Sequence, residues 1–376
     1  MRARGQPAIA LIARTTLAAA LPTAVFAAQP PGITLSQLLE DSGLTASGYL
    51  AASYYRSSGF NTDHQFDVSH ESLQLDQAGL TLGYQPAQGF GALVNVIGGS
   101  DARIVNTAEG NTPATVDLLQ AYLQYAHGPL TVEAGKFTTL AGAEVIAPTG
   151  DTNFSRSLLF FAEPMTHTGV RATVVLNAAL SVTVGLNNGW NYTDTGRGPR
   201  TAELALALTP DKAVALSAQA YVGEDPVYRA QRTFIDTVAT FNATSTLSFI
   251  VSYDWGRQQA SASSREAGLA AGEWEGLAAY VNKQLNPRWR VSLRGEYLDD
   301  RNGASFLTGV PQSLKEATVT FGYDPVAAFE LRVEGRRDFA SRASFVRSAG
   351  TLPDGTPFTT YARGESEVAI QGVYRF

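Results

Sequence analysis

Cysteine is absent from this chain of 376 residues, and histidine is scarce, with four residues. The lack of cysteine excludes a disulfide framework, a thiolate metal site and a cysteine nucleophile. The histidines, His64, His70, His127 and His167, are not spaced like the ligands of a metal site. The sequence also lacks a Gly-x-Ser-x-Gly elbow and the glycine motifs that bind phosphate. The sequence therefore lacks the motifs by which common enzymes, metal sites and nucleotide sites are recognised.

Long apolar runs and a strong excess of charge are missing too. Beyond the N-terminal region, no run approaches the roughly 18 apolar residues that a transmembrane helix needs. The mean hydropathy is −0.06 and 16% of residues are charged, which suits a soluble protein and equally a barrel with alternating apolar and polar residues. The formal net charge of −6 gives no reason to expect a nucleic-acid partner. The 35 glycines and many aromatic residues indicate β structure with tight turns.

Residues 1–27 have the pattern of a secretory signal peptide. A positively charged start is followed by an apolar, alanine-rich stretch and a cleavage pattern of small residues. Because Arg14 interrupts the apolar stretch, a retained membrane helix is not expected. We expect export, with cleavage after Ala27 or after Ala28. The segment 28–43 that follows contains one helix candidate, Pro30–Gly43, with a capping box at its start.

Residues 365–376 alternate strictly, as a strand does and a helix does not. One face is apolar and ends in two aromatic residues: Val368, Ile370, Gly372, Tyr374 and Phe376. The other face carries Glu367, Gln371 and Arg375. The stretch resembles the closing strand of a bacterial outer-membrane β-barrel, although a strand of a soluble sandwich would also alternate. In a barrel, the apolar set would face lipid and the polar set would face the lumen.

Sixteen candidate strands lie between Leu44–Arg56 and Gly364–Phe376. Short and long connections alternate along the chain, which is typical of outer-membrane barrels with short periplasmic turns and long outer loops. We therefore predict an all-β fold, a sixteen-stranded antiparallel transmembrane barrel formed by residues 44–376. Strands two, ten and twelve alternate poorly, which indicates either bulges or misplaced strand limits. One misassigned hairpin would make the count fourteen or eighteen. Aromatic residues near strand ends suit interfacial girdles: Trp190, Tyr253, Trp255, Trp274, Trp289, Tyr297, Tyr323, Tyr374 and Phe376.

Charged residues occupy the polar faces of the last four predicted strands. They are expected to form one wall of the lumen: Arg290, Arg294, Glu296, Glu330, Arg332, Glu334, Arg336, Asp338 and Arg375. Sixteen strands leave room for an aqueous channel. These charges could sort solutes, or they could simply pair with one another, as polar barrel interiors often do.

The connection 138–164 is the longest and is unusually apolar for a solvent-exposed loop. It contains Val145, Ile146, Phe154, Leu158, Leu159, Phe160 and Phe161. Folding into the barrel would bury these residues against the wall. The loop's charged residues, Glu144, Asp151, Arg156 and Glu163, would then point towards the lumen.

Several motifs give the chain a family resemblance. They are Gly135-Lys-Phe137, Glu144-Val-Ile146, Asn153–Ser157, Pro164–Arg171 and Gly185–Trp190, with Leu73–Ala78 and Leu119–Tyr122 before them. The sequence resembles the putative β-barrel porin-2 family of Gram-negative outer membranes. The resemblance implies an outer-membrane porin without catalytic residues. General porins with sixteen strands add, by analogy only, an inward-folded third loop that constricts the pore, and a homotrimer.

His167 and Arg171 lie on one face of the strand that leaves this loop. They could complete a constriction opposite Glu144 or Asp151, or they could pin the loop by hydrogen bonds without touching solute. A His-Glu-Ser sequence at residues 70–72 lacks an identifiable third catalytic group. We therefore expect neither an enzyme nor a bound cofactor or metal.

The function expected from the sequence is passive diffusion of small hydrophilic solutes or ions across the bacterial outer membrane, through a pore narrowed by loop 138–164. A substrate-selective channel and a non-conducting structural or adhesive barrel are the alternatives. The expected partners are outer-membrane lipid and the solutes themselves.

Overall fold

The computed structural model describes residues 42–61, 63–68, 71–303, 310–352 and 355–376. The predicted signal peptide, nearly all of the helix candidate 30–43, and His70 lie outside these residues. Sixteen strands form a closed antiparallel barrel. These are β1 (Thr45–Ser57), β2 (Leu73–Tyr84), β3 (Gly89–Gly98), β4 (Val116–His127), β5 (Leu130–Thr138), β6 (Thr166–Val175), β7 (Leu180–Asn187), β8 (Thr201–Leu208), β9 (Val214–Asp225), β10 (Ala230–Thr244), β11 (Leu247–Gln258), β12 (Gly272–Asn286), β13 (Trp289–Asp300), β14 (Gln312–Val326), β15 (Phe329–Ala340) and β18 (Gly364–Arg375).

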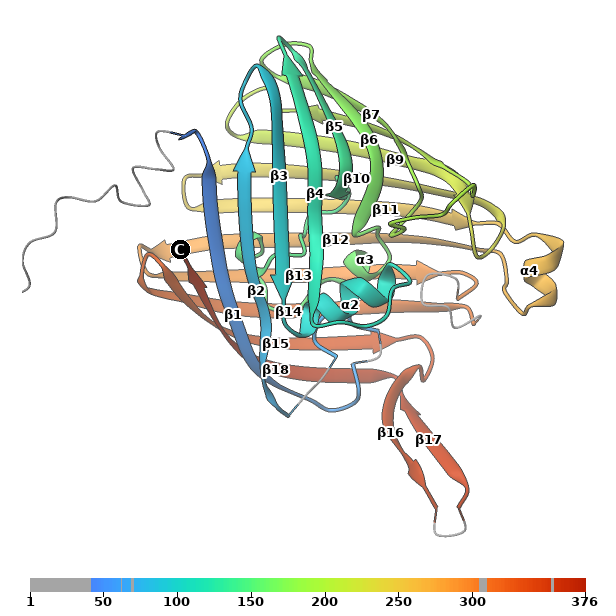
Figure 1. The fold of residues 1–376 in the computed structure, drawn as a ribbon. Coiled ribbons are helices and arrows are strands. Elements are labelled where there is room, and N and C mark those ends of the chain that lie inside the picture. Colours follow the sequence, from blue (N-terminus) through green and yellow to red (C-terminus); the bar gives the residue numbers. More distant parts are fainter. Residues whose placement is uncertain (1–41, 62, 69–70, 304–309, 353–354) are drawn as a thin grey trace, which may run out of the picture.

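The barrel closes between its first and last strands, as the sequence predicts. β1 pairs with β2 on one side and with β18 on the other, where Leu50 lies opposite Tyr374. Each of the other strands pairs with its neighbours in chain order, except that β15 pairs with β18 (Figure 1). Closure leaves no free sheet edge, which is the condition for a sheet to span lipid.

The two faces of the strands separate as the alternation requires. In β18, Val368 and Ile370 are 64% and 43% exposed on the outside, whereas Glu367 is 2% exposed on the inside. The same parity places Leu293 outside and Arg294 inside in β13. Lipid cannot solvate charge, so this separation suits a barrel in a bilayer.

Two of the aromatic residues expected in the outer girdles face inward instead. Trp274 is buried inside the barrel, and Trp190 packs against it at a ring-centroid distance of 6.3 Å. Near the other end of the barrel, the rings of Trp289 and Tyr323 on neighbouring strands pack against each other on the outer face, with a centroid distance of 4.5 Å. Position near a strand end was therefore not sufficient to distinguish a girdle residue from a luminal one.

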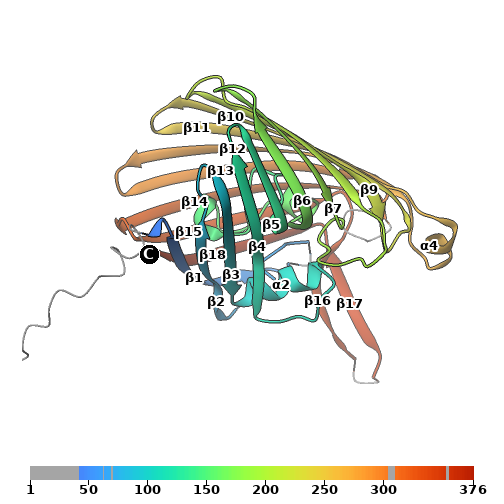
Figure 2. The ribbon, with the colours of Figure 1, turned by 45° about the horizontal axis from the view of Figure 1, so that its top comes forward.

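The connections alternate in length, with one exception. The even-numbered connections are short turns, and most others are long, but β9 and β10 are joined by only residues 226–229. The long connections contain structure that the sequence reasoning described only as loop: α2 (Ser100–Ala108), η1 (Pro148–Gly150), α3 (Leu158–Phe161) and α4 (Ala262–Glu266). The connection 342–363 forms a separate hairpin of β16 (Phe345–Thr351) and β17 (Pro357–Ala362), which projects from the barrel (Figure 1, Figure 2).

Irregular pairing occurs in the three strands that alternate poorly. The register shifts opposite Ala51 in the pairing of β1 with β2, near Asn242 in β10, and near Gln284 in β12. Two further shifts in the barrel, opposite Asn95 and near Tyr323, were not predicted. Among the described residues, no helix has the length and apolar character required to cross a membrane.

Candidate pore constriction

The connection 138–164, here called the inner loop, folds into the barrel. Its short helix α3 lies inside the ring of strands (Figure 1, Figure 2). The loop's polar contacts reach β13, β14 and β15, more than 100 residues further along the chain. The inward position predicted from the loop's length and composition is therefore what the structure shows.

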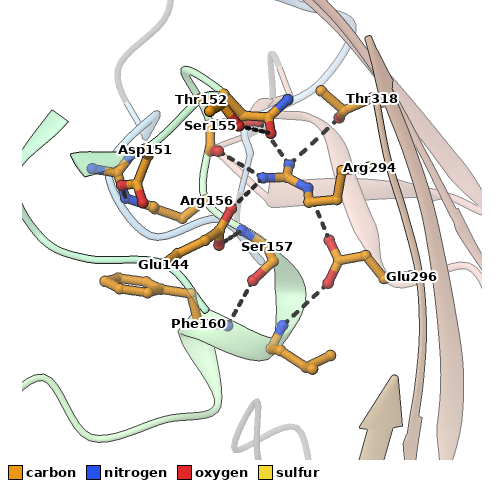
Figure 3. Close-up of polar contacts among 12 residues, drawn as sticks. Glu144, Asp151, Thr152, Ser155, Arg156, Ser157, Phe160, Arg294, Glu296 and Thr318 are labelled. Carbon is orange, nitrogen blue, oxygen red and sulfur yellow. Dashed lines mark hydrogen bonds and ion pairs between the residues drawn. The ribbon is translucent and has the colours of Figure 1, made fainter. Parts of the chain in front are cut away.

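Arg294 on β13 is the central contact between the wall and the inner loop. Its guanidinium donates to Glu144 Oε1 at 2.8 Å and to the Ser155 carbonyl at 2.7 Å. On the wall side it pairs with Glu316 of β14 at 3.0 Å. Figure 3 shows Arg294 between the loop and the wall. A buried guanidinium needs such partners, because an unpaired charge there is very costly.

Carboxylates of the wall hold the loop's backbone amides. Glu296 on β13 accepts hydrogen bonds from Leu158 N at 2.9 Å and Leu159 N at 3.3 Å, at the start of α3 (Figure 3). Ser157 caps the same turn by accepting from Phe160 N at 3.0 Å. These contacts satisfy amides that a helix start leaves without intrahelical partners.

A second wall carboxylate, that of Glu334, binds amides that precede α3 in the loop. Glu334 on β15 accepts from Phe154 N at 2.6 Å and from Ser155 N at 2.9 Å. Thr320 of β14 donates to the same carboxylate at 2.6 Å. Hydrogen bonds to an ionised acceptor are stronger than neutral ones, so Glu334 is a firm anchor for this part of the loop.

Arginines of β15 bind the loop's carbonyls. Arg332 donates to the carbonyl oxygens of Pro148 and Asp151, both at 2.9 Å. Arg336 donates to the Arg156 carbonyl at 2.6 Å and pairs with Asp338 at 2.8 Å. The wall charges therefore bind both the loop backbone and one another.

The remaining predicted wall residues cluster toward the short-turn end of the barrel. Glu330 on β15 accepts from Arg290 Nε at 2.8 Å, and from Arg332 and Arg375, both at 2.9 Å. Arg290 also donates to the Thr152 carbonyl at 2.6 Å, which brings the tip of the inner loop to this end.

The inner loop's own charged residues do not stand free in the lumen. Arg156 pairs with Asp151 at 3.0 Å and donates to the carbonyls of Val145 and Ile146 at 2.8 and 3.0 Å. Glu163 turns to β10 and β11. Of the loop's apolar residues, Val145 is largely exposed, whereas Leu158 and Leu159 are fully buried.

His167 and Arg171 lie where the loop joins the barrel. Arg171 pairs with Glu203 of β8 at 2.7 Å, donates to the Thr138 carbonyl at 3.3 Å, and lies 3.9 Å from the ring centre of Phe137. His167 stacks on Tyr221 at 4.8 Å, and its Nδ1 lies 3.1 Å from the Gly189 carbonyl. Contacts with Thr138 and Phe137 favour the pinning role for Arg171.

Apolar clusters pack the inner loop against the wall on two sides. Around Leu158 and Leu159, one cluster includes Tyr221, Phe234, Trp274, Tyr280, Leu298 and Leu314. Around Ile146 and Phe160, the other includes Phe66, Ile97, Val105, Leu119 and Met165. The inner-loop residues of both clusters are among those whose burial the sequence predicts, whereas none of the wall residues was predicted to face the lumen, and Trp274 was expected in an outer girdle. Strict parity along β12 and β13 could have identified Trp274 and Leu298, because both share a face with charged or small luminal residues.

A cavity of about 410 Å³ remains between the inner loop and the wall of β1–β4. Its lining includes Asn95, Gln120, Thr138, Glu144, Ile146 and Arg375. The cavity lies toward the end of the barrel where Gly48 N donates to the Phe376 carbonyl. The lining is mixed, with hydrogen-bonding groups and apolar side chains side by side.

Comparisons with known proteins agree with this architecture. Residues 43–362 match the family described as Putative beta-barrel porin-2, OmpL-like. The solved structure of the outer membrane channel DcaP of Acinetobacter baumannii is 14% identical, with a TM-score of 0.59 over 89% of this chain and 97% of that one. No curated protein matches the chain.

Two further solved structures are similar at lower identity. An anion-selective porin from Comamonas acidovorans is 10% identical, with a TM-score of 0.60 over 89% of this chain and 99% of that one. The trimer form of OmpT, an outer membrane protein of Vibrio cholerae, is also 10% identical, with a TM-score of 0.59 and the same coverage. At these identities the likeness shows a shared barrel fold.

Proposed function

The chain belongs to the Putative beta-barrel porin-2, OmpL-like family and is an outer-membrane porin, and we propose that it conducts small hydrophilic solutes or ions passively through a pore narrowed by the inner loop. The observation that carries this proposal is the anchoring of residues 144–158 inside the barrel by β13, β14 and β15. A segment fixed by charged hydrogen bonds can set a stable pore diameter, which a free loop cannot.

The anchored loop and the paired wall charges favour selection of solutes by size over selection by charge. The arginines of β13 and β15 are occupied by Glu144, Glu316, Glu330, Asp338 and loop carbonyls. Paired charges exert a weaker field on passing ions than unpaired ones. We therefore propose that Glu144, Asp151, Arg156, Glu163, His167 and Arg171 shape the constriction through the loop's position, and that the wall charges give at most a modest ion preference.

The direct test is the conductance of refolded protein in a planar lipid bilayer. The proposal predicts discrete conductance steps with a small reversal potential under a salt gradient. Absence of any conductance would contradict the porin function and favour a non-conducting structural barrel. A large reversal potential would contradict the proposed dominance of size over charge.

A substrate-selective channel is the second candidate, favoured by the cavity beneath the inner loop. Its volume of about 410 Å³ lies within the range of small-molecule sites, roughly 300–1,000 Å³. A solute that binds there would block ion current at low concentration. Screening uncharged and charged small solutes for current block would identify such a site; no block by any of them would favour general diffusion.

We also propose an oligomeric state for the protein and no catalytic activity. OmpT of Vibrio cholerae forms a trimer, and by analogy we propose a homotrimer, to be tested by the mass of the protein extracted in mild detergent. Glu71 and Ser72 are exposed just before β2. We assign them no catalytic role, and we assign no cofactor to the chain.

A further inference from the structure

Three carboxylates meet where the end of the inner loop reaches the wall. Glu163 belongs to the loop, Asp236 to β10 and Asp254 to β11. Asp236 and Asp254 lie directly opposite each other in the pairing of the two strands. One oxygen from each of the three residues lies within 4.8 Å of the others.

These carboxylates are buried without partners that would balance their charge. Asp236 and Asp254 are both 0% exposed, and Glu163 is buried as well. Outside the three carboxyl groups themselves, no donor of the described residues reaches either oxygen of Asp254 or Asp236 Oδ2. Among the ion pairs of the described residues, none includes any of the three.

Several other buried carboxylates of the lumen pair directly with a cation. Asp117 pairs with Lys136 at 3.1 Å, and Glu203 pairs with Arg171 at 2.7 Å. A second acidic cluster, His64, Asp67 and Glu367, contains a histidine and receives a hydrogen bond from Asn61. The cluster of Glu163, Asp236 and Asp254 differs in containing no histidine and, within the described part of the chain, in forming no ion pair with lysine or arginine; Ser252 donates to Asp236 Oδ1 at 3.4 Å, but it carries no charge.

Buried carboxylates at this spacing must either take up protons or share a cation, because three unpaired charges in a low-dielectric site are prohibitively costly. Ca²⁺ binds carboxylate oxygens at roughly 2.3–2.6 Å, so oxygens on opposite sides of the ion are roughly 5 Å apart. The oxygen separations here fall within that span. Mg²⁺ requires shorter contacts, about 2.0–2.1 Å, and a stricter octahedron.

We propose that Glu163, Asp236 and Asp254 form a Ca²⁺ site that fastens the inner loop to β10 and β11. The unpartnered oxygens of Asp254 face the other two carboxylates and would be the principal ligands. The site goes beyond pore formation, since it would set how firmly the loop is held and not whether the barrel conducts.

The start of the loop also reaches this site. Gly142 N donates a hydrogen bond to Asp236, and the Glu163 carboxylate lies where a side chain on residue 142 would have to be. The positive φ of 87° at Gly142 further favours glycine. An ion bound here would hold residues 142 and 163 together, at a different sector of the wall from the one that anchors residues 144–158.

The test is calcium binding by the folded, detergent-solubilised protein after treatment with EDTA. Calorimetric titration should give one Ca²⁺ per chain, with weaker binding of Mg²⁺, and Ca²⁺ should raise the thermal unfolding midpoint. Losing an outer-shell partner of a metal ligand typically costs 10–100-fold in affinity. Losing a ligand itself, in Asp254→Asn or Glu163→Gln, should therefore reduce affinity by at least about 100-fold and abolish the thermal shift.

Asp117→Asn is the matched control, because it removes a buried luminal carboxylate that already has Lys136 as partner. It should leave calcium binding unchanged. Failure of the native protein to bind Ca²⁺ would overturn the proposal, as would equal binding by native protein and Asp254→Asn. If the unfolding midpoint responds to pH but not to Ca²⁺, the carboxylates bind protons and not a cation, and the proposal is also wrong. Conductance is measured separately, so failure here leaves the porin function untouched.

Discussion

Arg294 on β13 donates a hydrogen bond of 2.8 Å to Glu144 of the inner loop, although the two residues are 150 positions apart in the chain. Glu144 in turn accepts from Ser157 N at 2.7 Å. The pair therefore links the barrel wall to both the first and the second half of the loop. Arg294, a wall residue, and Glu144, a loop residue, together fix the position of the loop against the wall.

Replacing Arg294 with methionine should destabilise the protein and loosen the loop. The substitution keeps much of the side-chain volume but leaves Glu144 and Glu316 buried without their cation. Breaking a buried ion pair on one side typically costs about 3–5 kcal/mol, and we expect a loss of this size in urea unfolding. The matched control, Arg301→Met, removes an exposed ion cluster with Glu273 and Asp299, and should leave the unfolding midpoint unchanged.

Replacing Glu334 with glutamine should weaken one anchor of the loop without changing the barrel. The carboxylate accepts from Phe154 N and Ser155 N, and an amide can offer only one oxygen to these two donors. A buried donor left unsatisfied costs about 1–3 kcal/mol. Hydrogen exchange at residues 154 and 155 should accelerate accordingly. Unchanged exchange would show that other contacts hold the loop; Glu275→Gln on the outer face is the control.

Charge placed on the outer face should be costly, because that face contacts lipid. Ile370 lies near the middle of β18 with its side chain outside. Arginine at the bilayer midplane of a barrel costs roughly 2–4 kcal/mol, so Ile370→Arg should lose that amount in unfolding from lipid bilayers. Thr359→Arg on the projecting hairpin strand β17 is the control and should be tolerated. Equal stability of the two variants would contradict the assignment of the lipid-facing side.

Most of the fold could be predicted from the alternation of apolar and polar residues, because neighbouring residues of a membrane strand face lipid and water in turn. It correctly placed Glu367 and Gln371 inside and Ile370 outside, and it gave sixteen barrel strands. The polarity of neighbouring residues was misleading near strand ends: strict parity along β12 places Trp274 inside, but its outward neighbours Glu273 and Glu275 are charged and form ion pairs with Arg301. There water is within reach, so polarity no longer distinguishes the two faces.

The inward loop could be predicted, but its contacts could not. Length and apolar composition indicate burial of residues 138–164, whereas the choice of Glu296 and Glu334 as acceptors depends on which strands lie opposite in the closed barrel. The same applies to Asp236 and Asp254, which become neighbours of Glu163 only after the loop folds inward. Helix α2 was missed because a short helix supported by tertiary packing has little signal of its own.

The single-channel conductance of a variant that lacks Ala143–Asn153 shows whether the inner loop narrows the pore. These residues contain η1 and the contacts of Glu144, Asp151 and Asn153 with the wall. The control deletion, residues 262–268, removes α4, which projects from the barrel (Figure 1). If the inner loop narrows the pore, the first deletion will raise the conductance and the control deletion will leave it unchanged. An unchanged conductance after deletion of Ala143–Asn153 would show that the inner loop does not constrict the pore.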